Sequence, residues 1–414
     1  NFKHLYMRYL YIFILLSSYA MAQNGDLHNK GEMFVFPNTI ISFKSNFINT
    51  NLGEFYNEGD AFFYADFINN GIYDFTNNSS LNRFVGDTTQ NILGQSTSYF
   101  NDVLFQNTSS QSPFNLLSDI NVYGLVDFYD GIVNNNNGAL FLFREQAEHT
   151  NTSDYSHVEG PVDKIGDADF IFPVGDLGYY RYAGLSSFES LNSYQVEYFA
   201  ENSDALYSHE FRSENLTLIN NTEYWRIEST VSEDVMLTLS WRESVTQDEI
   251  IESPEQNDIH IVRWDTEEKK WIDEGGVVSL ANQTVTTAIN KLGVFTLGKI
   301  ETEEELPCEV IVYNAVTPNN DGVNDFFRID KVNNNCIKEL NVKIFNRWGV
   351  KVFESSNYGE GGNVFRGFSE GRVTLNQDKQ LPTGTYFYVL EHDYDTDDGV
   401  KHHKEAGYLY LNGN

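Results

Sequence analysis

The first half of the chain alternates short apolar runs with corners rich in asparagine and glycine. "FYNEGD" (residues 55–60) is followed twelve residues later by "FINNGI" (67–72), and the same texture recurs in "GLVDFYDGIVNNNNGALFLF" (124–143). Aromatic and β-branched residues favour strands, and Asn-Gly pairs favour tight turns between them. For residues 23–152 the pattern predicts a β-solenoid, whose rungs bury their apolar faces only by stacking. The spacing is irregular, so a β-sandwich is the alternative.

A second pattern of longer, regularly alternating runs predicts a β-sandwich over residues 153–300. It includes "EYWRIEST", "VMLTLSWRES", "DIHIVRWDTEEKKWI" and "GVFTLGK". Four tryptophans occupy these strand registers, and aromatic residues so placed usually form a core. We therefore expect Trp225, Trp241, Trp264 and Trp271 to pack inside this sandwich. The acidic run "ETEEELP" (301–307) then predicts an extended linker, because like charges repel and proline stiffens the chain.

The last hundred residues carry a third set of alternating segments. Strands are expected near residues 309–314, 325–330, 340–346, 350–354, 385–392 and 406–411, with turn signals between them. The domain expected at 308–414 is thus also all-β. The whole chain is assigned to the all-β class.

Composition and the first residues indicate an exported protein. Sixty acidic residues against 27 basic ones give a net charge of −33, which disfavours binding to nucleic acid or to anionic membranes. Residues 1–22 resemble a signal peptide: a weakly basic start, an apolar run over residues 10–16 too short to span a bilayer, and small residues before Gln23. No later run is apolar enough for a transmembrane helix, so we expect no membrane span after cleavage.

Two cysteines, Cys308 and Cys336, are present. In an oxidising compartment an even pair predicts one disulfide, with two buried thiols as the alternative.

The sequence offers no catalytic arrangement, so we expect the protein to have no enzymatic activity and to bind no cofactor. It lacks the H-E-x-x-H, P-loop and G-x-S-x-G patterns. The segment "NNDGVND" presents the oxygen ligands that calcium prefers, but its spacing does not fit an EF-hand loop. An Asx-turn without metal is the interpretation that we favour.

An ordered set of short motifs ends at the C-terminus: "TPNNDGVND", "NRWG", "LPTGTY" and "GY". Over about residues 309–411 the chain resembles the type B sorting domain of Bacteroidetes proteins exported by the type 9 secretion system. That domain is also called the gliding-motility-associated C-terminal domain. One departure is Asn320, where the family usually has glycine; asparagine tolerates the left-handed backbone region better than most residues. The matching positions are Thr317, Pro318, Asn319, Asp321, Gly322, Asn324, Asp325, Asn346, Arg347, Trp348, Gly349, Leu381, Pro382, Gly384, Thr385, Tyr386, Gly407 and Tyr408.

The resemblance implies an Ig-like sandwich of about seven strands that directs the protein across the outer membrane. The implied partners are the type 9 translocon, its outer-membrane shuttle barrel and a SprF/PorP-like outer-membrane barrel. The implied route runs through the periplasm to the cell surface or the medium. For the passenger we expect an adhesive or gliding-related role. The alternatives are a carbohydrate-binding or carbohydrate-active surface protein on the solenoid, and an accessory component of the secretion or gliding machinery.

The turn "NRWG" presents two residues that a turn does not require, Arg347 and Trp348. One hypothesis is that they form a recognition surface, because Trp and Arg are enriched at interface hot spots. The other is that Trp348 packs on the domain core while Arg347 pairs with a carboxylate such as Asp325. Since neighbouring strand residues point to opposite sides, we expect the two side chains to diverge.

Overall fold

The computed structural model describes residues 25–77, 79–187, 191–231, 233–254, 257–301, 308, 310–331, 337–369, 380–396 and 399–413. This part of the chain is all-β, as predicted, with two short 3-10 segments, η1 (Ser203–Ala205) and η3 (Glu360–Gly362). Among these residues no helix is long and apolar enough to cross a membrane. The expected signal peptide, most of the expected linker and Cys336 lie outside the described residues.

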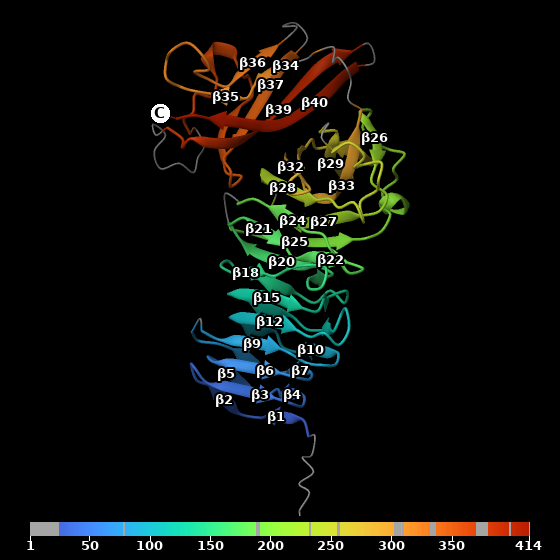
Figure 1. Cartoon of the computed structure of the whole chain (residues 1–414), viewed down its shortest axis with the longest axis vertical. Coiled ribbons are helices and arrows are strands. Elements are labelled where there is room, and N and C mark those ends of the chain that lie inside the picture. Colours follow the sequence, from blue (N-terminus) through green and yellow to red (C-terminus); the bar gives the residue numbers. More distant parts are fainter. Residues whose placement is uncertain are drawn as a thin grey trace, which may run out of the picture.

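The N-terminal region is a β-solenoid of about seven turns, so the β-sandwich alternative is wrong here (Figure 1). Each complete turn contributes one strand to each of three parallel sheets. The first sheet contains β1 (Leu27–Asn29), β4 (Phe47–Asn49), β7 (Phe67–Asn69), β10 (Gln90–Gly94), β13 (Phe114–Leu116), β16 (Val133–Asn134), β19 (Val158–Glu159) and β22 (Val174–Asp176), and ends on antiparallel β23 (Tyr179–Tyr180). The second contains β2 (Glu32–Val35), β5 (Glu54–Asn57), β8 (Ile72–Asp74), β11 (Ser98–Phe100), β14 (Ile120–Val122), β17 (Phe141–Phe143) and β20 (Val162–Gly166). The third contains β3 (Ile40–Phe43), β6 (Asp60–Phe63), β9 (Leu81–Phe84), β12 (Asp102–Gln106), β15 (Leu125–Asp130) and β18 (Glu148–Thr150).

The turns differ in length, which explains the irregular period of the sequence. Leu27 pairs with Phe47 and Phe47 with Phe67, twenty residues per turn, whereas Phe67 pairs with Ile92, twenty-five residues later. The twelve-residue recurrence is not a turn of the solenoid, because Phe55 lies in β5 of the second sheet and Phe67 in β7 of the first.

Aromatic rings stacked along the axis fill the solenoid interior. Consecutive turns place a phenylalanine at the same position of the third sheet, with ring centroids 5.1–5.9 Å apart and interplanar angles of 13–23°. Stacked aromatic pairs contribute about 0.5–1.5 kcal/mol each beyond their buried area. The ladder contains Phe43, Phe63, Phe84, Phe105 and Phe128.

Buried asparagines form a second ladder at one corner. The side-chain amide of Asn29 donates to Asn49 Oδ1 at 2.9 Å, Asn49 donates to Asn69 Oδ1 at 2.9 Å, and Asn69 donates to Ser98 Oγ at 2.9 Å. Asn49 also donates to the carbonyl of Ile72, so its amide joins two turns. A buried amide needs such partners, because an unsatisfied buried polar group costs about 1–3 kcal/mol.

The last turn of the solenoid continues directly into a central β-sandwich. β20 pairs antiparallel with β25 (Asn192–Phe199), and the second sheet thereby extends to thirteen strands. Its further strands are β27 (Tyr224–Ser229), β33 (Gly293–Ile300), β29 (Ile259–Asp265), β30 (Lys270–Asp273) and β26 (Leu216–Ile219). The facing sheet contains β21 (Phe170–Phe172), β24 (Ala183–Leu185), β28 (Val235–Ser240), β32 (Thr284–Ile289) and β31 (Val277–Ser279).

One hydrophobic core runs through both regions, from Val35 in the solenoid to Leu297 in the sandwich. Trp225, Trp241 and Trp271 are buried as predicted, while Trp264 is partly buried and packs beside Trp271. The expected domain limits at 152/153, 300/301 and 307/308 stay predictions. Parallel pairing nevertheless continues past the first of them as far as β22.

The C-terminal region forms two further sheets that fit a β-sandwich, and the strands expected from the sequence are present. β34 (Val310–Tyr313) pairs with β36 (Arg328–Lys331). The larger sheet has the order β35 (Ala315–Val316), β40 (Gly399–Leu411), β39 (Gly384–Thr396), β37 (Ile337–Phe345) and β38 (Lys351–Ser355). A separate core, which includes Phe327, Phe353, Phe365 and Leu409, holds these sheets together.

The asparagine ladder predicts that Asn49→Leu destabilises the solenoid by about 1–3 kcal/mol, because it removes one hydrogen-bond partner each from the Asn29 amide, Asn69 Oδ1 and the Ile72 carbonyl. Asn51→Ala, an exposed change at the same corner, is the control and should cost less than about 0.5 kcal/mol. Urea unfolding of the purified full chain measures both. Equal effects would show that the buried amide ladder contributes nothing specific.

The Cys308–Cys336 disulfide stays a prediction. Cys308 is buried in the C-terminal core, and the bond would constrain the unfolded chain by about 3–4 kcal/mol. We expect non-reducing peptide mapping of the purified protein to recover the two cysteines in one linked species. Recovery of both as alkylated thiols would refute the pairing.

Candidate functional site

The segment from Thr317 to Asp325 is a loop closed by its own side chains. The Asp325 carboxylate accepts the backbone N–H of Asn320 at 2.6 Å and of Gly322 at 2.8 Å. Asp321 accepts the N–H of Val323 at 2.8 Å. The Asx-turn that the sequence predicts is thus present, and its carboxylates bind backbone donors. In the described part of the chain, no group of three or more His, Cys, Asp or Glu side chains is arranged to hold a metal ion.

The backbone of this loop explains the composition of the motif. Asn320, Gly322 and Asn324 all have positive φ, at 61°, 86° and 54°. The left-handed region favours glycine and, next to it, asparagine, so Asn320 stands where the backbone needs one of these two residues. Hydrogen bonds from the Asn319 amide and the Val323 N–H lower the pKa of the Asp321 carboxyl below its ordinary value.

The turn at residues 346–349 connects β37 with β38, and its first and last residues build it. Asn346 Oδ1 accepts the N–H of Trp348 at 3.0 Å and of Val350 at 2.9 Å. Gly349 has a φ of 76°. Asn346 and Gly349 therefore account for the turn, and the side chains of Arg347 and Trp348 are free for another role.

Arg347 and Trp348 lie against one another at the tip. The guanidinium carbon of Arg347 is 4.1 Å from the centroid of the Trp348 ring, and Trp348 is 50% exposed. The expectation that the two side chains diverge is wrong, because the alternation of strands does not extend into the turn. The placement of Trp348 in the domain core is wrong as well. Asp325, the suggested partner of Arg347, instead binds its own loop.

The same turn docks on the central sandwich. The carbonyl oxygen of Trp348 accepts hydrogen bonds from the N–H and the hydroxyl of Ser187, at 3.3 and 2.8 Å. A Cβ at Gly349 would clash with Ser186. Glycine at this position is therefore required both by its φ and by the close approach of the two domains.

An apolar contact and flanking ion pairs extend the docking. Phe345, Phe387, Val389 and Ala406 from the C-terminal sheet are buried with Met236, Val277 and Ala288 of the central sandwich. Beside this cluster, Asp234 binds Lys343 at 3.0 Å and Lys351 at 2.7 Å. Burial alone would raise the pKa of Asp234, but the two lysines hold it below its ordinary value.

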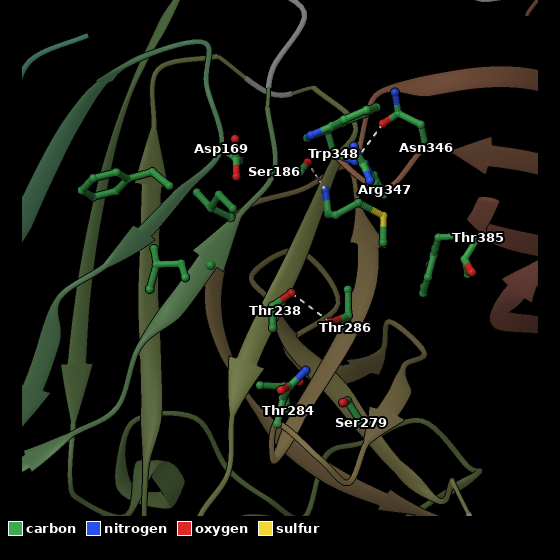
Figure 2. Close-up of a pocket in the computed structure, with 18 of the residues that line it drawn as sticks. Asp169, Ser186, Thr238, Ser279, Thr284, Thr286, Asn346, Arg347, Trp348 and Thr385 are labelled. Carbon is green, nitrogen blue, oxygen red and sulfur yellow. Dashed lines mark hydrogen bonds between the residues drawn. The ribbon is translucent and has the colours of Figure 1, made fainter. Parts of the chain in front are cut away.

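Next to the docked turn the two domains enclose a cleft of about 520 Å³. Figure 2 shows Arg347 and Trp348 at one end, Thr238 and Thr286 in the middle, and Thr284 and Ser279 toward the other end. The C-terminal sheet supplies the opposite wall, where Thr385, Phe387 and Tyr408 lie.

The structure distributes the remaining sequence-predicted site residues between core and cleft. Gly407 faces Tyr388 across the β39–β40 hairpin, and a Cβ there would clash with the Tyr388 ring. Tyr386 is buried and donates its hydroxyl to the carbonyl of Pro382 at 2.8 Å. Tyr408 is 46% exposed. A Cβ at Gly384 would meet no atom within 4 Å, and nothing in the packing explains this glycine.

Two separate groups of predicted residues therefore emerge. Residues 346–349, Tyr386 and Tyr408 line the cleft, whereas the 317–325 loop is not among its lining residues. Sequence reasoning missed the opposite side of the cleft, including Ser186, Thr238 and Thr286. Nothing in the sequence distinguished these residues, because what they face depends on the docked sorting domain.

Residues 310–411 match the family model of the CHU_C Type IX secretion signal domain. The C-terminal region is therefore a type B sorting domain, as the motif set indicated. No curated protein and no solved structure matches the chain.

The close approach at Gly349 predicts a strong effect of Gly349→Ala on domain docking. Gly359→Ala is the matched control, because Gly359 also has a positive φ, at 91°, but open space around its Cβ position. The control should lose about 1–2 kcal/mol from backbone strain alone. Gly349→Ala should lose about 1–3 kcal/mol more through the clash.

Scanning calorimetry of the full chain measures the loss. Adding Ser186→Gly to Gly349→Ala should recover part of it. Equal losses in the two glycine variants, or no recovery in the double variant, would contradict the docking.

Proposed function

We propose that the chain is a non-enzymatic adhesive surface protein, delivered by the type 9 machinery and recognised through its Arg347–Trp348 turn. The observation that carries the proposal is the sorting domain at residues 310–411. A type IX secretion signal implies interaction with the secretion machinery and export to the cell surface or the extracellular space. The finer steps belong to the proposal: a cleaved signal peptide, a periplasmic intermediate, and contacts with the translocon, its shuttle barrel and a SprF/PorP-like barrel.

The geometry of the turn supports its assignment as the recognition surface. Trp348 exposes half of its surface, and the guanidinium of Arg347 packs on the ring. The backbone beneath them is fixed by Asn346 and by the contact with Ser187. A partner would therefore meet two hot-spot residues already held in place, and less conformational entropy would be lost on binding.

The solenoid interior supports a non-enzymatic passenger. Its buried positions are mostly apolar residues and asparagine, with Asp163 and Lys164 buried in the last turn. Glu58 is a buried carboxylate of this region, and the backbone and hydroxyl of Thr76 and the N–H of Asn77 bind it. The hydrogen-bonding capacity of this carboxylate is thus taken up by its own corner. We propose that the passenger acts by adhesion. The process that this adhesion serves would be gliding.

The recognition role predicts that Arg347→Ala reduces export while the sorting domain stays folded, since an exposed substitution changes stability by less than about 0.5 kcal/mol. Arg366→Ala is the matched control, because Arg366 is also exposed and lies over the ring of Phe326 in the same domain. Deletion of residues 308–414 should abolish export.

Surface proteolysis and fractionation of the native host measure export. Normal export of Arg347→Ala would exclude this turn as the recognition surface. Normal export of the truncated protein would overturn the sorting role altogether.

A further inference from the structure

We propose that the cleft between the central sandwich and the sorting domain binds a short, uncharged oligosaccharide. This inference goes beyond export, because it assigns a ligand to a surface that exists only when the two domains are docked. It is carried by the composition of the two walls. One presents exposed aromatic rings and the other presents a row of hydroxyl groups.

The aromatic wall belongs to the sorting domain. Trp348 is 50% exposed and Tyr408 is 46% exposed, and both line the cleft. Phe387 of β39 also lines the cleft, although most of its ring is buried, and it lies 5.8 Å from the ring of Tyr408. Large aromatic rings at a concave surface provide flat apolar area with little conformational entropy to lose, as in most small-ligand sites.

The hydroxyl wall belongs to the outer face of the central sandwich. Gly184, Thr238 and Thr286 are direct neighbours across β24, β28 and β32. The hydroxyls of Thr238 and Thr286 lie 2.9 Å apart and share one hydrogen bond. Each hydroxyl has one donor and two acceptor positions, so the pair keeps one hydrogen and several lone pairs for a ligand. Thr284 and Ser279 extend this polar surface (Figure 2).

The floor of the cleft carries no side chain at Gly184, and internal packing does not require a glycine at this position. A Cβ there would make only an ordinary contact, 3.6 Å from Thr238 Cβ, and its backbone does not need glycine's positive φ. A larger side chain would project into the cleft. The position thus keeps space open beside the threonine pair.

A sugar ring matches both walls at once. Its C–H face is apolar and packs on an aromatic ring, while its edge carries hydroxyls that pair with threonine and serine. The volume of about 520 Å³ falls within the roughly 300–1,000 Å³ of typical ligand sites. The cleft is therefore large enough for a short oligosaccharide.

Other ligand classes fit less well. Asp169 and Arg347 contribute opposite charges to the lining, and the net charge of −33 repels acidic glycans and nucleic acids. A purely apolar ligand would remove water from the threonine hydroxyls without replacing their hydrogen bonds. Thr238 and Thr286 present side chains from paired strands, so an added peptide strand would find no free backbone edge between them.

The experiment uses the purified full chain and a panel of neutral hexaoses, with a sulfated hexaose as the charged comparison. We expect calorimetric binding of at least one neutral hexaose and a change in tryptophan fluorescence. Thr286→Val, which replaces the hydroxyl with a methyl group, should weaken binding at least tenfold, and Thr286→Ser should restore it. Tyr408→Ala should also weaken binding at least tenfold. Tyr410→Ala should leave it unchanged, because Tyr410 is equally exposed on the same strand but does not line the cleft.

Thermal melts of each variant verify folding. Absence of binding to every neutral hexaose at millimolar concentration would overturn the proposal. Binding confined to the sulfated hexaose would overturn it too, as would binding that Thr286→Val and Tyr408→Ala leave intact. Each of these results concerns purified protein, so the export role of the sorting domain is tested separately.

Discussion

The fold depends on the in-register parallel pairing of successive solenoid turns. Because each strand lies directly over the equivalent strand one turn earlier, every inward side chain must be compatible with a similar neighbour above and below. Phenylalanine over phenylalanine satisfies this requirement through stacking, and asparagine over asparagine through a chain of amide hydrogen bonds. A stack of this kind leaves its last turn with unpaired backbone groups, and such an edge invites aggregation. Here β25 covers the end of the second sheet by pairing with β20, and β23 covers the end of the first by pairing with β22. The central sandwich therefore continues the solenoid sheet, and the two share one core.

Much of this architecture could be predicted from the sequence, because local alternation determines which residues form strands and which face inward. The buried tryptophans Trp225 and Trp271 and the strands of the sorting domain follow from that rule. The number of residues in each solenoid turn does not follow from local alternation. Strands are conserved in position across turns while corners vary in length, so Phe67 finds its partner in Ile92 rather than at a fixed interval.

The candidate site was predictable only on one side. The motif residues of the sorting domain stand out through their composition, and Asn320 shows why: its positive φ admits few residue types. The docking of this turn could not be inferred, because the Trp348 carbonyl binds Ser187, which is 161 residues away in the chain. Thr238 and Thr286 are ordinary outward residues until the sorting domain is placed opposite them.

The thirteen-stranded sheet also has a mechanical consequence (Figure 1). Its strands lie across the long axis of the molecule, so the inter-strand hydrogen bonds run along that axis. Tension along the axis therefore pulls these bonds apart lengthwise, and successive turns carry the same load in series. Each complete turn resists with its bonds in all three faces together, and the load passes through β25 into the sandwich without crossing a flexible joint. A pull on the far end is thus shared by the three sheets along the solenoid and reaches the sandwich through the second of them. The first turn, paired on one side only among the described residues, is where peeling would start.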